Sequence, residues 1–200
     1  MAELLSALSG RFACRKFHGR PVEIHELDLV LEAGRIAPSA FGMEPWRFVV
    51  VQSPAARAKV AAACFGQEAV VSAPVLVAIV AQVGVLQPDS AFVEARLTAE
   101  SGGSPPSKEL REMYRDFYAG IEPRAWATAQ CNFAAAQMMV QATGIGLATC
   151  PVGGYDEEAL IAALGLAEGE APALVLALGH CLQPQGERRR RGMRELVTAI

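Results

Sequence analysis

The chain has 200 residues, of which 52% are hydrophobic and 20% are charged, so it is long and apolar enough to form a packed globular core. Eighteen cationic and 21 acidic residues give a formal net charge of −3 at pH 7, which disfavours a generally basic nucleic-acid binder. This composition also excludes collagen-like and intrinsically disordered chains. We expect a single domain over residues 1–200.

Apolar periodicity and turn residues predict the elements in chain order. Ser9-Gly10 ends a first short helix, Pro38 requires the second helix to stop before it, and Ser53-Pro54 has the pattern of an N-cap followed by a helix-starting proline. The continuous apolar run 74–81 is typical of a strand covered on both faces. The predicted helices are 2–8, 24–37, 54–64, 108–118, 123–143 and 156–165; the predicted strands are 47–52, 74–81, 147–150 and 173–178, with an edge strand in the tail 194–200.

Two segments differ from the rest. Residues 87–107 have the weakest pattern, and Gly102-Gly103 and Pro105-Pro106 interrupt them, so we expect a mobile excursion there. Residues 182–200 are expected to form a C-terminal arm. The remaining elements predict an α+β fold, in which helices pack on one mostly buried sheet.

Residues 125–155 contain no charged side chain. Gln130, Asn132, Gln137 and Gln141 nevertheless recur through this stretch, and each amide is costly in a bilayer unless it is paired. We therefore expect no membrane span. The stretch indicates a central helix buried within its own domain, or also against a second subunit.

The cysteine pattern favours a reduced protein. The five cysteines form no CxxC pair, and their odd number argues against a closed disulfide framework. Cys14 is expected to be a free structural cysteine, although neighbouring cations could lower the pKa of its thiol and give it a nucleophilic role. The first residues lack the pattern of a secretory signal, so a cytoplasmic location is expected. His18, His25 and His180 lack metal-ligand spacing, and we expect no metal site.

Half of the cationic residues lie in two basic islands. One holds Arg11, Arg15, Lys16 and Arg20, and the other holds residues 188–191 with Arg194. Two such islands in an otherwise acidic chain indicate a local anionic ligand, or simply two solvated segments. The run RRRRGMR alone is also compatible with RNA binding.

Three stretches occur in a specific order: GRFACRKF at 10–17, APSAFGMEPWRFVVV at 37–51 and ATCPVGGYD at 148–156. This ordered set resembles the FMN-dependent nitroreductase family, and the similarity covers almost the whole chain. The resemblance implies a nitroreductase-like fold with a central, mostly antiparallel or mixed sheet flanked by helices. It also implies an interlocked homodimer that buries FMN at its interface, with no nucleic-acid or membrane partner.

The resemblance assigns roles to individual residues. Arg11 grips the FMN phosphate, Arg15 lies by the N1/O2 edge of the ring, and the tail arginines complete the phosphate clamp, with Arg188 and Arg190 as alternatives in register. The backbone of 151–154 passes over the flavin, Gln67 meets the pyrimidine edge, and 38–40 with Gln130 reach the cofactor from the other subunit. The implied cofactor residues are Arg11, Phe12, Ala13, Arg15, Pro38, Ser39, Ala40, Gln67, Gln130, Pro151, Val152, Gly153, Gly154, Arg189 and Arg191.

The implied activity is hydride transfer from NAD(P)H to flavin N5, followed by reduction of nitroaromatic, quinone or similar acceptors in a ping-pong cycle. Candidates for an aromatic wall facing the substrate, or for core packing, are Phe41, Tyr114, Phe117 and Tyr118. The alternatives are a specialised flavin enzyme for dehydrogenation, dehalogenation or flavin fragmentation, and a non-catalytic flavin- or RNA-binding module. Gly42 and Glu44 depart from the family pattern, which commonly has Asn and Gln before Pro-Trp.

Overall fold

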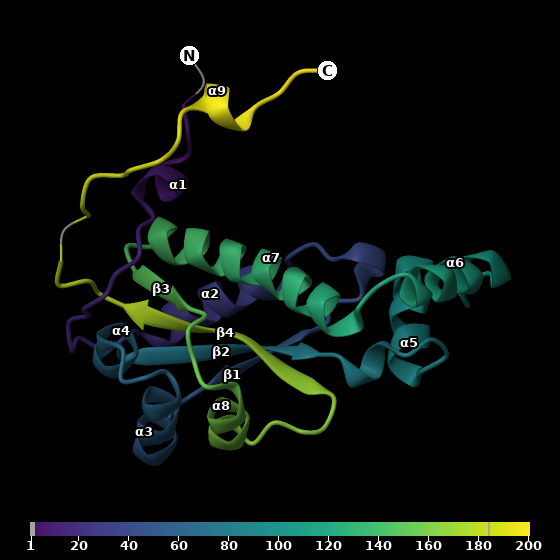
Figure 1. Cartoon of the computed structure of the whole chain (residues 1–200), viewed down its shortest axis with the longest axis horizontal. Coiled ribbons are helices and arrows are strands. Elements are labelled where there is room, and N and C mark those ends of the chain that lie inside the picture. Colours follow the sequence, from purple (N-terminus) through teal and green to yellow (C-terminus); the bar gives the residue numbers. More distant parts are fainter. Residues whose placement is uncertain (1–2, 184) are drawn as a thin grey trace.

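A computed structural model describes residues 3–183 and 185–200, and its centre is a four-stranded sheet (Figure 1). The strands lie in the order β1-β2-β4-β3, and each neighbouring pair is antiparallel. The two central strands are buried nearly throughout, as their apolar runs predict. The strand bounds are β1 (Trp46–Val50), β2 (Val75–Gln82), β3 (Ala148–Val152) and β4 (Glu170–Gly179). The predicted α+β class is confirmed.

Helices and two short 3-10 turns surround the sheet, and α7 is much the longest of them. Their bounds are α1 (Ser6–Gly10), α2 (Ile24–Arg35), η1 (Ala40–Gly42), α3 (Pro54–Ala63), α4 (Glu68–Ser72), η2 (Gly84–Leu86), α5 (Ala91–Glu100), α6 (Lys108–Ala119), α7 (Pro123–Gly144), α8 (Glu157–Leu164) and α9 (Met193–Leu196).

The sheet separates two hydrophobic cores. Val77 and Ile79 of β2 point into a core formed with α2, α5, α6 and α7, whereas Leu76 and Ala78 point into a core formed with α3, α4 and α8. Successive side chains of a strand face opposite sides of its sheet, so one apolar run supplies both cores. Figure 1 shows α7 on one side of the sheet and α3 and α8 on the other.

Local capping signals set several helix ends where the sequence predicts them. The Ser53 hydroxyl accepts a hydrogen bond from the Ala56 N–H at 3.2 Å, and Pro54 opens α3. The Asp156 carboxylate accepts one from the Ala159 N–H at 3.0 Å at the start of α8. Gly165 then ends α8 with a left-handed φ of 61°, a conformation that glycine adopts without a Cβ clash.

Two predictions about the elements are corrected, and one element was missed. The weakly patterned segment 87–107 contains the α5 helix. That this segment is mobile stays a prediction. The short α4 helix was not predicted. The tail forms α9 and then extended backbone, and among the described residues it pairs with none of the four strands, so the predicted edge strand is not part of this sheet.

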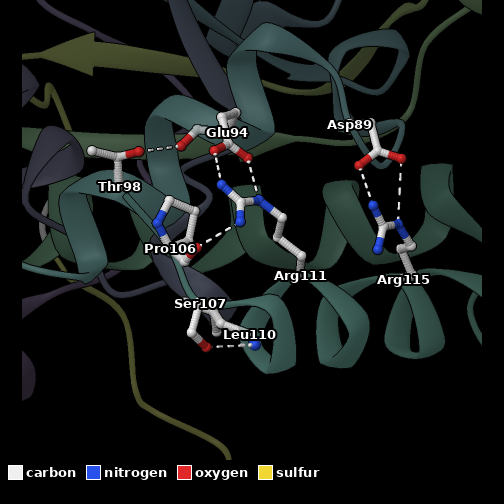
Figure 2. Close-up of polar contacts among 8 residues, drawn as sticks. All are labelled: Asp89, Glu94, Thr98, Pro106, Ser107, Leu110, Arg111 and Arg115. Atoms are coloured by element: carbon white, nitrogen blue, oxygen red, sulfur yellow. Dashed lines mark hydrogen bonds and ion pairs between the residues drawn. The ribbon is translucent and has the colours of Figure 1, made fainter. Parts of the chain in front are cut away.

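Ion pairs join α6 to α5 and to the residues just before it (Figure 2), beside apolar side chains such as Val93, Leu97 and Tyr114 that lie in the core. Arg111 of α6 forms a bidentate pair with Glu94 of α5, and its Nη1 donates to the Pro106 carbonyl at 2.6 Å. Arg115, one turn further along, pairs with Asp89 at 2.6 Å. Bidentate contacts of this kind fix the relative orientation of the paired groups, so they add to the apolar packing of these two helices.

The long α7 helix has a buried face and an exposed face. Residues such as Cys131, Ala134 and Met138 lie in the core. The opposite face exposes a stripe of uncharged residues, namely Ala125, Ala129, Asn132, Phe133 and Ala136. Within the described part of the chain, α7 and the other helices all lack the length and apolarity needed to cross a membrane.

Candidate functional site

A basic pocket lies where the N-terminal loop meets the C-terminal arm. Its volume is about 250 Å³, and four of its lining residues are arginines. One lining residue, Glu187, is acidic, so the lining carries a net positive charge. The complete lining is Arg11, Phe12, Ala13, Arg15, Gln185, Gly186, Glu187, Arg188 and Arg190.

The N-terminal side of the pocket is held by the edge of the sheet. The Cys14 N–H donates to the Thr149 carbonyl of β3 at 2.9 Å, and Ala13 forms a β-bridge with the same residue. The Arg15 guanidinium also acts on Cys150 of β3. Burial raises the pKa of the Cys150 thiol, and the positive charge of Arg15 offsets part of that rise. The basic loop therefore lies directly beside the end of β3.

A disulfide joins the two sides of the pocket. Cys14 is bonded to Cys181, which corrects the prediction that Cys14 is free. An odd number of cysteines leaves at least one thiol unpaired but does not prevent the others from forming a disulfide. The two bonded cysteines are 167 positions apart in the sequence, so their pairing has no local pattern. Around the bond, the His18 N–H donates to the His180 carbonyl at 2.7 Å, and the Leu182 N–H to that of Lys16 at 3.0 Å. Backbone pairing thus brings together the two segments that the disulfide links.

The other cysteines are poor candidates for a nucleophile. Cys64, Cys131 and Cys150 are buried thiols. Burial raises the pKa of Cys64 to about 11 and that of Cys131 to about 12. Thiolate is the reactive form of cysteine, so these thiols are unreactive at neutral pH. Clusters of His, Cys, Asp and Glu that could hold a metal ion do not occur among the described residues.

The structure favours one register for the tail arginines. Arg188 and Arg190 line the pocket, whereas Arg189 and Arg191 are not part of its lining. The Arg188 guanidinium crosses to the N-terminal segment and donates to the carbonyls of Ser9 at 2.7 Å and Arg11 at 2.6 Å. Arg189 instead approaches Glu187 at 3.9 Å. The alternative pair named from the sequence is therefore the one that faces the pocket.

Close to the basic loop, the chain after β3 forms an open glycine segment. A Cβ built on Gly153 would have no atom within 4 Å, so space lies in front of this backbone. The Gln67 amide donates to the Gly154 carbonyl at 2.7 Å and fixes the segment. Lys16 approaches Glu68, the next residue after Gln67, at 3.8 Å. Residues 151–154 and Gln67 are thus brought together beside the basic loop.

A second group of predicted site residues lies elsewhere in the chain. The Ala40 N–H donates to the Gln130 side-chain oxygen at 3.1 Å, and the Ser39 hydroxyl accepts a hydrogen bond from the Glu44 N–H at 2.8 Å. Pro38 is exposed next to them. Gln130 is almost fully buried in α7, and its amide holds the start of the 39–44 turn.

The predicted aromatic group forms as a cluster. The ring of Phe41 lies 5.4 Å from that of Tyr114 and 5.0 Å from that of Phe117, and Phe117 packs on Trp126 at 5.5 Å. Tyr114 is fully buried and its hydroxyl donates to the Leu86 carbonyl at 2.7 Å, while burial raises its pKa to about 12. Tyr114 is therefore a core residue, whereas Phe41, Phe117 and Tyr118 keep partly exposed rings.

The two groups lie on different sides of the molecule. Figure 1 shows α1 and the chain that leads to α9 on the left, and α5 and α6 on the right. Arg188 and the basic pocket lie beside α1, whereas the η1 turn contacts α5, and Tyr114, Phe117 and Tyr118 belong to α6.

Sequence reasoning did not name residues 185–187 or Cys181 as part of this site. Residues 185–187 directly precede the arginine run, and this position is the one feature of the sequence that could have placed them in the pocket lining. Cys181 lies two residues after the end of β4, but nothing in its local sequence points to Cys14.

Fold and site together define an α+β protein with a basic pocket where its N-terminal loop meets its C-terminal arm. The model of the nitroreductase family matches residues 8–180, and the chain belongs to this family. An NADH dehydrogenase of Thermus thermophilus is 33% identical to it over 172 residues, which cover 85% of this chain and 82% of that protein. The predicted family is confirmed.

Solved structures share the fold. A nitroreductase-like protein from Streptococcus mutans matches with a TM-score of 0.86 at 21% identity, over 98% of this chain and 97% of that one. A structure from Exiguobacterium sibiricum, described as a nitroreductase in complex with FMN, matches with a TM-score of 0.81 at 21% identity, over 100% of this chain and 98% of that one. The predicted nitroreductase-like fold is confirmed.

Proposed function

We propose that this chain is an NAD(P)H-dependent FMN oxidoreductase that reduces nitroaromatic, quinone or similar acceptors in a ping-pong cycle. Membership of the nitroreductase family and the fold shared with an FMN complex support the proposal. The observation that carries it is the basic pocket, in which segments from opposite ends of the chain gather four arginine side chains beside an open glycine segment.

The donor set of the pocket fits a phosphate. Guanidinium groups form short, charge-assisted and often bidentate hydrogen bonds with phosphate oxygens. Arg11, Arg188 and Arg190 would hold the phosphate of FMN, and the carbonyl contacts of Arg188 keep its charge at the mouth of the pocket. Arg189 and Arg191, the pair implied first by the resemblance, are secondary candidates in this proposal.

The remaining residues fit a flat, polar-edged ring. When bound, FMN supplies hydride acceptance and electron transfer at N5. Arg15 would stabilise negative charge at the electron-rich edge of the ring, because a fixed guanidinium lowers the energy of charge that develops beside it. Gln67 would orient the pyrimidine edge, and the exposed backbone of Gly153 and Gly154 allows close approach of the ring.

Two copies of the chain would complete each site. The basic pocket measures about 250 Å³, which is below the roughly 300–1,000 Å³ typical of small-molecule sites, so one chain supplies only part of the enclosure. The turn at residues 38–40, which Gln130 holds, lies beside α5 and away from α1, and in a homodimer it would reach the ligand of a partner. The uncharged exposed face of α7 supplies a surface suited to such an interface.

The partly exposed rings of Phe41, Phe117 and Tyr118 would border the acceptor in that dimer. Aromatic rings favour stacked or edge-on contact with other planar rings. Their presence at the same end of the chain as residues 38–40 is the reason we favour planar aromatic or quinone acceptors.

Flavin content and its reduction test the proposal. The purified chain is expected to be yellow and to bleach when NADH or NADPH is added under anaerobic conditions. Replacing Arg11 by Ala removes a charge-assisted contact worth about 1.5–3 kcal/mol, so FMN affinity should fall roughly 10- to 100-fold. Fluorescence titration of the apo-protein with FMN measures this change. Arg20→Ala is the matched control, because Arg20 is an exposed cation of the same loop outside the pocket lining.

Other outcomes would separate the alternatives. A colourless protein that takes up no FMN contradicts every flavin-based function. Colour without bleaching favours a specialised flavin enzyme or a flavin-binding module. Strong, salt-sensitive RNA binding favours the RNA-binding module.

A further inference from the structure

The turn formed by residues 39–44 has an unusual backbone. Phe41, Gly42 and Glu44 have positive φ angles of 54°, 56° and 44°. For residues with a Cβ, left-handed backbone is strained by contact of the Cβ with the following carbonyl oxygen, and it persists only where surrounding contacts hold it. Two of these three residues are not glycine, so the turn depends on such contacts.

Arg96 of α5 supplies the main contacts to the second half of this turn. Its Nε donates to the Gly42 carbonyl at 2.6 Å, and its Nη2 donates to the Glu44 carboxylate at 2.5 Å. The exposed fractions of the Arg96 and Glu44 side chains are 25% and 38%, so water screens the pair only in part. One guanidinium thus holds a backbone carbonyl and a carboxylate at once, which an ammonium group cannot do with the same planar geometry.

The first half of the turn has a different anchor. The Gln130 amide oxygen accepts the Ala40 N–H, independently of α5. Glu100, one helical turn after Arg96, covers Gly42 so closely that a Cβ there would lie 1.9 Å from its carboxylate oxygen. One face of α5 therefore holds residues 42–44, while α7 holds Ala40.

The position between these two anchors belongs to Phe41, whose ring packs on Tyr114 and Phe117. We propose that Arg96 is a positioning residue for the acceptor site: through Gly42 and Glu44 it holds the left-handed turn that keeps Phe41 in the aromatic group. This inference rests on the proposed function, because the acceptor site is part of that proposal. It also explains Gly42 and Glu44 together: the first fits beneath Glu100, and the second is the carboxylate that Arg96 binds.

The first test uses the apo-protein and needs no activity. The chain's two tryptophans report on this region: the Trp46 backbone N–H donates to the Glu44 carbonyl at 2.7 Å, and Trp126 packs on Phe117, against which the Phe41 ring also packs. Arg96→Ala is expected to raise the acrylamide quenching constant of tryptophan fluorescence by about twofold, because the loosened turn exposes these rings. Arg96→Lys keeps the charge but not the double contact, so an intermediate constant is expected.

The second test uses the FMN-loaded enzyme with two acceptors. For menadione, a planar quinone, Arg96→Ala is expected to raise KM about five- to tenfold while kcat changes less than twofold, because the binding wall is affected more than the transfer step. For ferricyanide, which needs no aromatic wall, KM should stay within about twofold. Arg96→Lys should give an intermediate KM for menadione.

Arg115→Ala is the matched control. Arg115 also pairs with a carboxylate in the α5–α6 region, as Figure 2 shows, but it makes no hydrogen bond to the 39–44 turn. Wild-type quenching and wild-type KM in this variant, with changes in Arg96→Ala, support the inference. Unchanged quenching and KM in Arg96→Ala, or equal changes in both variants, overturn it. A wild-type chain that binds no FMN refutes the proposed function instead, and the quenching test still decides whether Arg96 holds the turn.

Discussion

Neighbouring arginines in the C-terminal run have very different surroundings. Arg188 crosses to the N-terminal segment, where the carbonyls of Ser9 and Arg11 hold its guanidinium in the wall of the basic pocket. Arg189 is directed to Glu187 and is highly exposed. Because a fixed charge stabilises a bound anion more than a mobile, solvated one does, the two side chains are not interchangeable.

This difference predicts unequal effects on FMN binding. Arg188→Ala should weaken FMN binding about 10- to 100-fold, because a charge-assisted contact of about 1.5–3 kcal/mol is lost. Arg189→Ala is the control of equal charge and should change the affinity less than about threefold. Isothermal titration of the apo-proteins with FMN measures both. A larger loss of FMN affinity in Arg189→Ala than in Arg188→Ala would show that Arg189 and Arg191, and not Arg188 and Arg190, hold the phosphate.

At the scale of elements, one ion pair joins strands that do not touch. Arg47 of β1 and Glu170 of β4 form a bidentate pair, although β2 lies between the two strands. The exposed fraction of the Glu170 side chain is only 14%. The hydrogen bonds from Arg47 lower the pKa of Glu170, and the Ala167 N–H adds to this effect.

The lowered pKa of Glu170 predicts how stability depends on pH. Its ionised form is favoured in the folded state, so the pair stabilises the fold above the pKa of about 4.3 in the unfolded chain, and this contribution is lost as the pH falls through the folded pKa. Glu170→Gln should lower the free energy of unfolding by about 0.5–1 kcal/mol at pH 7, and this difference should shrink at pH 3.5. Urea unfolding measures both values.

Glu32→Gln is the matched control for this prediction. Glu32 also pairs with an arginine, Arg35, but both side chains are more than half exposed, so its effect should be smaller than that of Glu170. A difference at Glu170 that grows toward low pH would contradict the assignment.

Several elements with local signals could be predicted, whereas contacts between distant residues could not. The ends of α3 and α8 follow from Ser53, Asp156 and Gly165, which act through hydrogen bonds and φ angles of their own neighbourhoods. The α5 helix was missed although Ser90 caps it and Val93 and Leu97 are buried one turn apart; its ion pair with Arg111 of α6 is the part that adjacent sequence does not reveal. The apolar tail suggested a strand, but a strand needs a free sheet edge that sequence alone does not locate.

At the scale of the whole molecule, the proposed active site requires two copies. The basic pocket lies beside α1 and the 38–41 segment beside α5, and Figure 1 shows these two helices on opposite sides of the molecule. In a twofold dimer, the same pair of surfaces occurs twice, so each ligand would meet the pocket of one copy and the turn of the other.

A charge on the exposed face of α7 should therefore disrupt both the dimer and FMN binding. Ala136 is exposed in the single chain, so Ala136→Glu should fold normally, yet a buried unpaired charge at an interface costs several kcal/mol. Size-exclusion chromatography with light scattering should detect monomers, and the absorbance of bound flavin should fall.

Ala162→Glu is the control for that experiment. It places the same charge on an exposed residue of α8, on the other side of the sheet, and should leave the mass and the flavin content unchanged. A wild-type chain that is already monomeric and retains FMN would contradict the two-copy site.

The composition of the site was predictable, but its arrangement was not. Ordered motifs near residues 11, 38 and 151 indicated the family, because each motif is local and its order is visible in the sequence. The contact between Arg188 and Arg11 spans 177 residues, and one step along the arginine run changes which side chain enters the pocket. The bond between Cys14 and Cys181 has no local signal either, since only the folded backbone brings these residues together.

That bond has a mechanical consequence. A force applied to the two ends of the chain would pass through the disulfide and not through the sheet. The segment between the linked cysteines, which are 167 positions apart, would therefore carry no load. Cleaving the link with a thiol reductant would expose the sheet to the load. Complete extension would then release a further contour length of about 550–600 Å.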